Sequence, residues 1–219
     1  MIKQVLYGLK QLYYGLILAP MGKGSPLSKE LWDSRYRDGY SENQLRSLND
    51  FARYMIIAGY VHFLFKRPKI LDVGCGDGIL VEVLPCSSFE SYLGIDVSAE
   101  AVKKAESLAL PRVQFEVCNF EEWTPAEKYD VIIFNESLYY AKHPSKLVLD
   151  YAESLNDGGL IIVSMCRFLH HPAMLWRSLK KLFDTVDSTV IKTYKGELYN
   201  IKVLKKRRMD GRPASLKPV

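Results

Sequence analysis

The stretch that decides the fold is Lys69-Ile70-Leu71-Asp72-Val73-Gly74-Cys75-Gly76-Asp77-Gly78, which the run 79–84 follows directly. It predicts a short apolar strand that ends in a glycine-rich turn and leads into a helix. Such a turn presents backbone N–H groups and a helix N-terminus to a ligand, and glycine lets the ligand approach the main chain closely. The sequence therefore predicts a site for a nucleotide-type ligand at the end of this strand.

A second acidic residue strengthens that prediction. Asp96 ends the strand-like run 91–96, 18 residues after Gly78. A carboxylate at the tip of the neighbouring strand can accept hydrogen bonds from both hydroxyls of a ribose. We therefore expect the glycine-rich turn and Asp96 to bind one ligand together.

The spacing of the glycines separates two types of cofactor. A dinucleotide site requires the pattern G-x-G-x-x-G, and Ile79 occupies the position of its third glycine. An acid, Asp72, also stands two residues before the first glycine, where it would repel a pyrophosphate but attract a cationic amino-acid group. Both observations count against a nucleotide-dependent oxidoreductase, which remains the weaker alternative.

The motif Asp72-x-Gly74-x-Gly76-x-Gly78 resembles the S-adenosylmethionine-binding signature of class I methyltransferases, and residues 60–205 are similar to that family. The resemblance implies a Rossmann-like, doubly wound α/β fold, with a mostly parallel seven-stranded sheet, a C-terminal antiparallel hairpin and an N-terminal helical cap. It also implies a methyltransferase that uses S-adenosyl-L-methionine, releases S-adenosyl-L-homocysteine, and acts on oxygen or nitrogen of a small molecule such as a saccharide or natural product. A catalytically silent, methyltransferase-like binding module stays open as an alternative.

The same resemblance assigns the cofactor contacts. It places Asp72 near the methionyl amine, Asp96 on the ribose and Val97 beside the adenine. Asn119 stands where the family usually has an acid that binds the adenine amine, and an amide oxygen can accept the same hydrogen bond. The full set of predicted cofactor-binding residues is Asp72, Gly74, Cys75, Gly76, Gly78, Asp96, Val97, Asn119, Phe120 and Asn135.

Candidate catalytic residues follow two later strands. The run 135–140, Asn-Glu-Ser-Leu-Tyr-Tyr, follows a strand over 129–135 and is similar to small-molecule and saccharide methyltransferases. An oxygen acceptor needs a base, whereas a neutral amine mainly needs orientation and a route for proton loss. The candidates are Glu136, Tyr139, Tyr140, His170 and His171. A helix cap or a solvent-facing position is the alternative for the histidines, and core packing is the alternative for the tyrosines.

The elements alternate along the chain. Strands are predicted near 69–74, 91–96, 112–117, 129–135 and 159–165, with a hairpin over 185–194 and 197–204. Helices are predicted over 42–65, 78–84, 98–108, 144–155 and 172–183, with Ser98 as an N-cap and a turn over 157–159. This order predicts a parallel sheet with helices on both faces and ligands at the carboxyl ends of its strands. The expected parts are a cap (1–60), a core (61–205) and a basic tail (206–219).

The two ends of the chain are unlike the core. Residues 2–17 carry apolar side chains at helical spacing, and we expect them to pack near the substrate mouth as part of a lid. Residues 202–219 hold seven Lys/Arg and one acid. Because the net charge of the whole chain is +5, the rest of the chain is close to neutral. No basic face covers the domain, which argues against a nucleic-acid substrate. The N-terminal helix and the tail are candidates for peripheral contact with an anionic membrane.

Composition narrows the choice of domain number, metal content and location. A chain of 219 residues with 48% hydrophobic residues can bury the core of one α/β domain. Its four cysteines form no C-x-x-C pair, which argues against structural zinc and a disulfide framework, and no metal-type Asp/Asn/His spacing follows the strands. We therefore predict a cofactor without a metal. The chain shows no signal-peptide pattern and no apolar run of about 20 residues, so the cytoplasm is the expected location.

Overall fold

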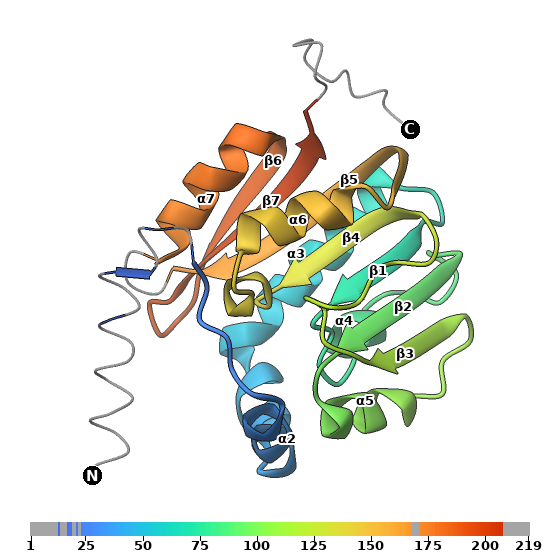
Figure 1. The fold of residues 1–219 in the computed structure, drawn as a ribbon. Helices are drawn as coiled ribbons and strands as arrows, with labels where there is room; N and C mark the ends of the chain where they lie inside the picture. The colour runs from blue at the N-terminus through green and yellow to red at the C-terminus, as the bar shows by residue number, and fades with distance from the viewer. Residues whose placement is uncertain (1–12, 14–16, 19–20, 22, 168–170, 208–219) are drawn as a thin grey trace.

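The computed structural model describes residues 13, 17–18, 21, 23–167 and 171–207. Within them lies a seven-stranded sheet in the order β3-β2-β1-β4-β5-β7-β6, with helices on both faces (Figure 1). The strands are β1 (Lys69–Val73), β2 (Ser91–Asp96), β3 (Val113–Val117), β4 (Tyr129–Asn135), β5 (Leu155–Cys166), β6 (Phe183–Lys192) and β7 (Leu198–Lys206). Strands β1 to β5 are parallel, whereas β7 pairs antiparallel with β5 and β6. The predicted doubly wound fold with a C-terminal antiparallel hairpin is confirmed.

The helices lie between these strands and before the first of them. They are α2 (Lys29–Arg37), the π-helix η2 (Ser41–Leu45), α3 (Leu48–Leu64), α4 (Ile79–Glu82), α5 (Ala99–Glu106), the 3-10 helix η3 (Leu138–Tyr140), α6 (Pro144–Ala152) and α7 (His171–Leu182). Ser98 caps α5 as expected, because its Oγ accepts a hydrogen bond from the N–H of Ala101 at 3.2 Å. No helix among the described residues is long and apolar enough to cross a membrane.

Two predicted boundaries are wrong. The single helix expected over 42–65 is divided into η2 and α3, because Ser47 is extended and begins a new helix with Asp50 in its first turn. The helix expected to reach 155 ends at Ala152, and β5 begins at Leu155. The turn predicted over 157–159 is therefore an irregularity within β5, where Gly158 has φ +84° and the register to β4 shifts.

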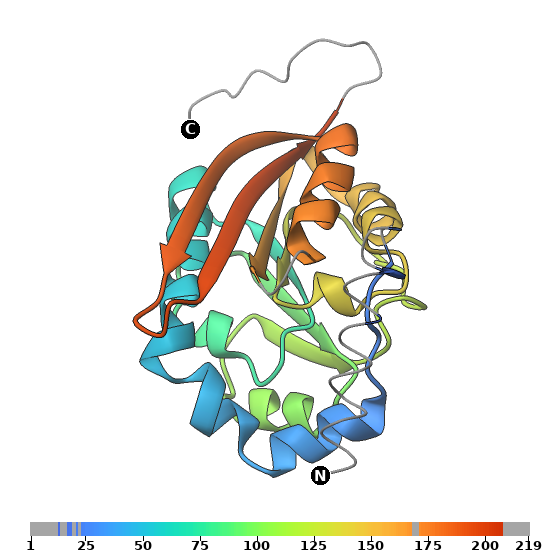
Figure 2. The same ribbon diagram turned by 90° about the vertical axis from the view of Figure 1, so that its left-hand side faces the viewer.

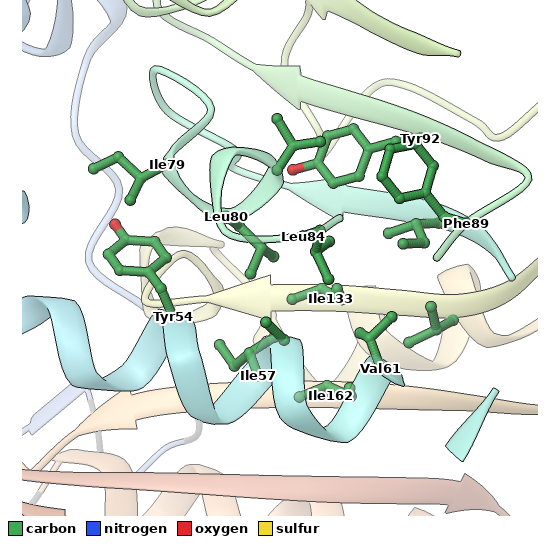
Figure 3. Close-up of a cluster of buried hydrophobic side chains, with 14 of the residues drawn as sticks. Tyr54, Ile57, Val61, Ile79, Leu80, Leu84, Phe89, Tyr92, Ile133 and Ile162 are labelled. Atoms are coloured by element: carbon green, nitrogen blue, oxygen red, sulfur yellow. The ribbon is translucent and has the colours of Figure 1, made fainter. Parts of the chain in front are cut away.

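Alternate residues of the central strands build two cores, one on each face of the sheet. Ile70, Val131 and Ile133 pack with residues of α3 and α4, whereas their neighbours along the same strands pack with α6 and α7. Figure 3 shows Ile57 and Val61 of α3 lying toward Ile133 of β4. These side chains are fully buried, so the sheet holds the carboxyl ends of its strands in fixed positions.

The segment before β1 borders the end of the sheet where the parallel strands stop. Figure 2 looks toward those carboxyl ends, and the blue segment with α2 lies beside them. The side chain of Asp33 on α2 accepts hydrogen bonds from Ser98 Oγ at 2.7 Å and from the N–H of Glu100, which joins α2 to the start of α5. The lid predicted over 2–17 and the tail predicted over 206–219 lie largely outside the described residues, although Lys206, the last residue of β7, and Arg207 are described. Both stay predictions, as does the division into three parts.

Candidate active site

A cavity of about 790 Å³ lies at the carboxyl ends of β1, β2, β4 and β5. Backbone and side chains of the glycine-rich turn form one part of its wall, and residues of α2, η2 and α3 close it from the other side. Trp32, Tyr36 and Tyr40 contribute aromatic rings to this roof. The cavity thus has the location that the alternating sequence pattern predicts.

The turn after β1 leaves no room for side chains at two of its glycines. Gly74 and Gly76 have φ angles of +79° and +58°, which favour glycine. A Cβ at Gly74 would overlap Ser137, and one at Gly76 would lie 2.5 Å from the hydroxyl oxygen of Tyr36. Gly78 does not line the cavity, and a Cβ there would meet Leu108. The first two glycines therefore shape the cavity wall, while Gly78 lets α4 pack closely.

Three buried carboxylates line the half of the cavity that adjoins the glycine-rich turn. Asp72 accepts a hydrogen bond from Tyr92 Oη at 2.5 Å through one oxygen, and its other oxygen has no partner among the described residues. Asp77 likewise has one oxygen bound by Ser41 Oγ and one oxygen without a partner within the described chain. Such buried acceptors are costly unless a ligand donates to them. The two free oxygens therefore point to a ligand with several donors, such as an ammonium group.

Asp96 is held by the backbone rather than by side chains. Its oxygens accept from the N–H of Gly76 and the N–H of Ser98, both at 2.9 Å. A carboxylate oxygen can accept two hydrogen bonds, so each oxygen still has capacity for a ligand hydroxyl. Val97, Asn119 and Phe120 line the same region.

The side chain of Asn119 is engaged in its own turn. Its oxygen accepts from the N–H of Glu121 at 3.1 Å, and its amide nitrogen donates to Glu122 at 3.0 Å. The oxygen keeps one further acceptor position, so the predicted contact with an adenine amine stays a prediction. Cys75 also lines the cavity, and Asn135 reaches it from the end of β4.

Burial changes the titration of the acids in this half. It raises the pKa of Asp72 to about 7 and the pKa of Asp96 to about 6. A cationic ligand group beside Asp72 would favour its charged form. The site is therefore suited to a cation.

The raised pKa of Asp72 predicts a pH dependence of stability. Its carboxyl stabilises the fold fully below its unfolded pKa of about 4, and this contribution is lost as the pH rises toward about 7. The partly buried acid Asp33, whose pKa is lowered to about 2, acts in the opposite sense. The comparison with Asp72→Asn therefore isolates the contribution of Asp72. We expect the melting temperature of the wild type, minus that of Asp72→Asn, to fall between pH 4.5 and 7.5. Scanning fluorimetry measures this difference, and a rising difference would contradict the prediction.

The second half of the cavity centres on Glu136, at the end of β4. Glu136 has φ +58°, a conformation that non-glycine residues rarely adopt and that is often found at functional sites. Its carboxylate accepts from Ser164 Oγ at 2.7 Å, from the N–H of Cys166 at 2.8 Å and from Tyr139 Oη at 3.1 Å. Burial raises the pKa of Glu136, while the nearby Arg53 opposes that rise. Three donors thus fix the carboxylate of Glu136 at the cavity wall.

Tyrosines and a tryptophan enclose the space next to Glu136. The rings of Tyr139 and Tyr140 are 4.6 Å apart between centroids, and the ring of Trp32 lies 5.0 Å from Tyr140 in an edge-on arrangement. Burial raises the pKa of Tyr139 well above its usual range, so this tyrosine stays protonated and donates to Glu136. The predicted candidates Glu136, Tyr139 and Tyr140 therefore lie together.

The structure does not test the two predicted histidines. His170 lies outside the described residues, and only the backbone of His171, at the start of α7, is described. Their role as a base stays a prediction. No group of three potential metal ligands is found among the residues that the structure describes.

Sequence reasoning missed a buried ionic network on α3. The guanidinium of Arg53, 2% exposed, donates to Asp50, to Asn135 Oδ1 at 3.1 Å and to Tyr54 Oη at 3.0 Å. Asp50 also accepts from Tyr199 Oη of β7 at 2.7 Å. All five residues line the cavity. The local signal was an Asp and an Arg three residues apart in an otherwise apolar helix; the partners on β4 and β7 come from distant sequence.

Residues 48–204 match a protein family described as "Methyltransferase domain". Among curated proteins, the chain is 30% identical over 146 residues to trans-aconitate 2-methyltransferase of Azoarcus sp., a match that covers 65% of this chain and 53% of that protein. It is 28% identical over 157 residues to ubiquinone biosynthesis O-methyltransferase of Paracidovorax citrulli, covering 67% of this chain and 60% of that one. The match to the mitochondrial enzyme of that name from Candida albicans covers 31% of that protein. The chain thus spans less than two thirds of these relatives.

Solved structures share the fold at low sequence identity. N-methyltransferase NodS of Bradyrhizobium japonicum, crystallised with S-adenosyl-L-homocysteine, superposes with a TM-score of 0.71 at 14% identity, over 82% of this chain and 98% of that one. A methyltransferase of Thiobacillus denitrificans with the same ligand gives 0.63 at 16% identity, over 83% and 100%. The [4+2]-cyclase SpnF gives 0.68 at 17%, over 84% and 97%. The fold alone therefore does not decide the reaction.

Proposed function

The chain belongs to the methyltransferase domain family and has the class I, S-adenosylmethionine-dependent fold, and on this premise we propose that it methylates a small molecule with S-adenosyl-L-methionine as donor. The observation that carries the proposal is the set of buried carboxylates at the glycine-rich turn. Asp72 and Asp77 each keep an oxygen without a partner among the described residues, and Asp96 keeps acceptor capacity beside them. Donors of a ligand are needed there, and this cofactor carries an ammonium group and two ribose hydroxyls.

The chemistry of the lining assigns each part of the cofactor to residues. The free oxygens of Asp72 and Asp77 would hold the methionyl ammonium, and Asp96 would accept from the ribose hydroxyls. Val97, Phe120 and Asn119 are placed for the adenine. This arrangement would set protein acceptors opposite the ammonium group and the ribose hydroxyls of the cofactor.

When bound, S-adenosyl-L-methionine would supply a methyl group that passes to an acceptor atom in an in-line displacement, with the thioether of S-adenosyl-L-homocysteine as the leaving group. The protein has to orient the acceptor and to exclude water. Trp32, Tyr40 and Tyr140 form an apolar enclosure for it. Glu136 takes the proton that an oxygen or ammonium acceptor loses, and Tyr139 donates to the Glu136 carboxylate and fixes its orientation.

The acceptor is a small molecule in this proposal. The two curated relatives are named for a carboxylic acid and for a step in ubiquinone biosynthesis, and NodS is named as an N-methyltransferase. These names leave transfer to oxygen and to nitrogen equally open. Release of S-adenosyl-L-homocysteine in the presence of a panel of carboxylic acids, phenols and amines tests the proposal. Cofactor binding without turnover on any of them would favour the silent binding module or a different reaction, as in SpnF.

Replacing Asp96 by alanine is expected to weaken the affinity for S-adenosyl-L-methionine. The change removes two acceptors from the ribose, at a cost of about 1.5–3 kcal/mol, or roughly 10–150-fold in Kd. Isothermal titration calorimetry measures the affinity, and circular dichroism controls for folding, because Asp96 also accepts from the N–H groups of Gly76 and Ser98. Unchanged affinity in a folded Asp96→Ala protein would refute the assignment of Asp96.

Chelation of divalent metals is expected to leave turnover unchanged. Displacement at a sulfonium methyl needs no Lewis acid, and the residues proposed for each step are carboxylates, tyrosines and backbone groups of this chain. The rate is measured with and without EDTA, at constant ionic strength. A complete loss of turnover that magnesium restores would place the enzyme in a metal-dependent class and contradict the proposed mechanism.

A further inference from the structure

Arg35 of α2 lies at the boundary between the cavity and a neighbouring groove of about 580 Å³. The side chain is half-buried, and its guanidinium carbon lies 5.0 Å from the ring centroid of Trp32 and 5.7 Å from that of Tyr40. Arginine stacks on aromatic faces, and such contacts restrict its rotation. Two rings therefore hold this guanidinium in place at the opening between the two spaces.

Arg35 has no counter-ion within the described part of the chain, where it forms no ion pair and no hydrogen bond. The acids that line the groove each accept a hydrogen bond from inside the protein: Asp38 from Ser34, Asp50 from Arg53 and Glu197 from Asn49. Arg53, the other arginine at the cavity, is paired with Asp50. The donors of Arg35 are thus left for a ligand.

The position of Arg35 separates this ligand from the cofactor. The groove that it shares with the cavity includes none of the glycines of the turn, and neither Asp72 nor Asp96. It does include Tyr40, which also lines the cavity beside the aromatic enclosure. Because Arg35 also stacks on Trp32 and Tyr40 of the aromatic enclosure, we assign a group bound by it to the acceptor side. Because a planar guanidinium binds carboxylate and phosphate oxygens in a bidentate manner, an oxyanion is its matching partner.

We propose that Arg35 binds an oxyanion on a part of the acceptor that does not react, so that the acceptor is an anionic small molecule with a carboxylate or a phosphate. This inference rests on the proposed methyl transfer and adds the class of acceptor. The aromatic rings next to Arg35 cover the apolar body of the acceptor, while Arg35 fixes its charged end. The residue would then decide which acceptors bind and how they are oriented.

Calorimetric titration at constant ionic strength tests the inference with three probes that each carry one phenyl ring: benzoate, phenyl phosphate and neutral benzamide. Each is titrated into the wild type, Arg35→Gln and Arg35→Lys, with and without S-adenosyl-L-homocysteine. The matched control is Arg37→Gln, because Arg37 lies on the same helix, is 58% exposed and pairs with Glu100 outside the cavity. Titration of S-adenosyl-L-homocysteine alone reports separately on the proposed function.

We expect at least one anionic probe to bind the wild type roughly tenfold or more tightly than benzamide, as a charge-assisted bidentate contact provides. Arg35→Gln should remove this preference, Arg35→Lys should keep part of it, and Arg37→Gln should leave it unchanged. The inference is overturned if no anionic probe binds better than benzamide, or if the preference survives in Arg35→Gln. Either result, obtained while S-adenosyl-L-homocysteine still binds, would leave the proposed function intact. The difference between benzoate and phenyl phosphate shows which oxyanion the site prefers.

Discussion

Replacing Arg53 by methionine is expected to lower the free energy of unfolding by about 3–5 kcal/mol. Arg53 is 2% exposed and Asp50 is 5% exposed, so loss of the guanidinium leaves a buried carboxylate without its counter-ion. Methionine keeps most of the apolar stem of arginine, which limits the loss of packing. Urea denaturation of the purified protein measures the change, with the slope of the transition compared between the two proteins.

Two further variants separate the effect of leaving Asp50 without a counter-ion from the effect of losing the packing of Arg53. The double variant Asp50→Asn/Arg53→Met removes both charges and keeps an acceptor for Tyr199, so it should recover at least half of the lost stability. The surface variant Arg37→Met, which breaks an exposed pair with Glu100, should cost less than about 1 kcal/mol. A double variant as unstable as Arg53→Met would show that Arg53 acts by packing and not by pairing with Asp50.

Glu136→Gln is expected to reduce kcat by roughly 10²–10⁴-fold with an oxygen acceptor, the range typical of losing a general base. Glutamine fits the same space and can still contact Tyr139, Ser164 and the N–H of Cys166, but it cannot take a proton. Single-turnover kinetics on an acceptor from the panel measures the chemical step. Affinity for S-adenosyl-L-methionine should change by less than a few-fold.

The pH profile distinguishes a base from a residue that only shapes the pocket. Burial raises the pKa of Glu136, so the wild-type rate should rise with pH as this carboxyl loses its proton. Glu136→Gln should lose that rising limb. Tyr139→Phe keeps the carboxylate but removes one donor to it, so it should shift the limb to higher pH with a smaller loss of rate. A Glu136→Gln enzyme with the wild-type rate and profile would exclude Glu136 as the base.

The strand and turn at 69–78 could be predicted because local signals agree there. The apolar run, the glycines at 74 and 76 and the N-capping Ser98 each act within a few residues, and the structure places them as expected. The division of the helix over 42–65 was missed, because Ser47 and Arg46 are compatible with a helix locally. Arg46 instead pairs with Asp77 and Glu82 of the turn and of α4, which lie more than 30 residues away.

The half of the site that we propose for the cofactor was more predictable than the half proposed for the acceptor. The residues proposed for the cofactor follow strand ends that hydrophobic patterns locate, and the pairing of β1 with β2 brings Asp72 near Asp96. The acceptor half combines α2, α3, β4 and the hairpin strand β7. No local pattern links Arg53 to Asn135 and, through Asp50, to Tyr199, and the side-by-side position of these residues depends on the tertiary fold. The positive φ of Glu136 likewise follows from contacts with β5 and not from its sequence neighbours.

Calorimetric titration of the full chain with S-adenosyl-L-homocysteine and, separately, with NAD tests the central claim most directly. A cationic amino-acid end, a ribose and an adenine match the free oxygens of Asp72 and Asp77, the carboxylate of Asp96 and the surface around Val97. A pyrophosphate would instead face these carboxylates. We expect one S-adenosyl-L-homocysteine to bind per chain and NAD to give no heat of binding. Binding of NAD, or binding of neither ligand by the folded protein, would contradict it.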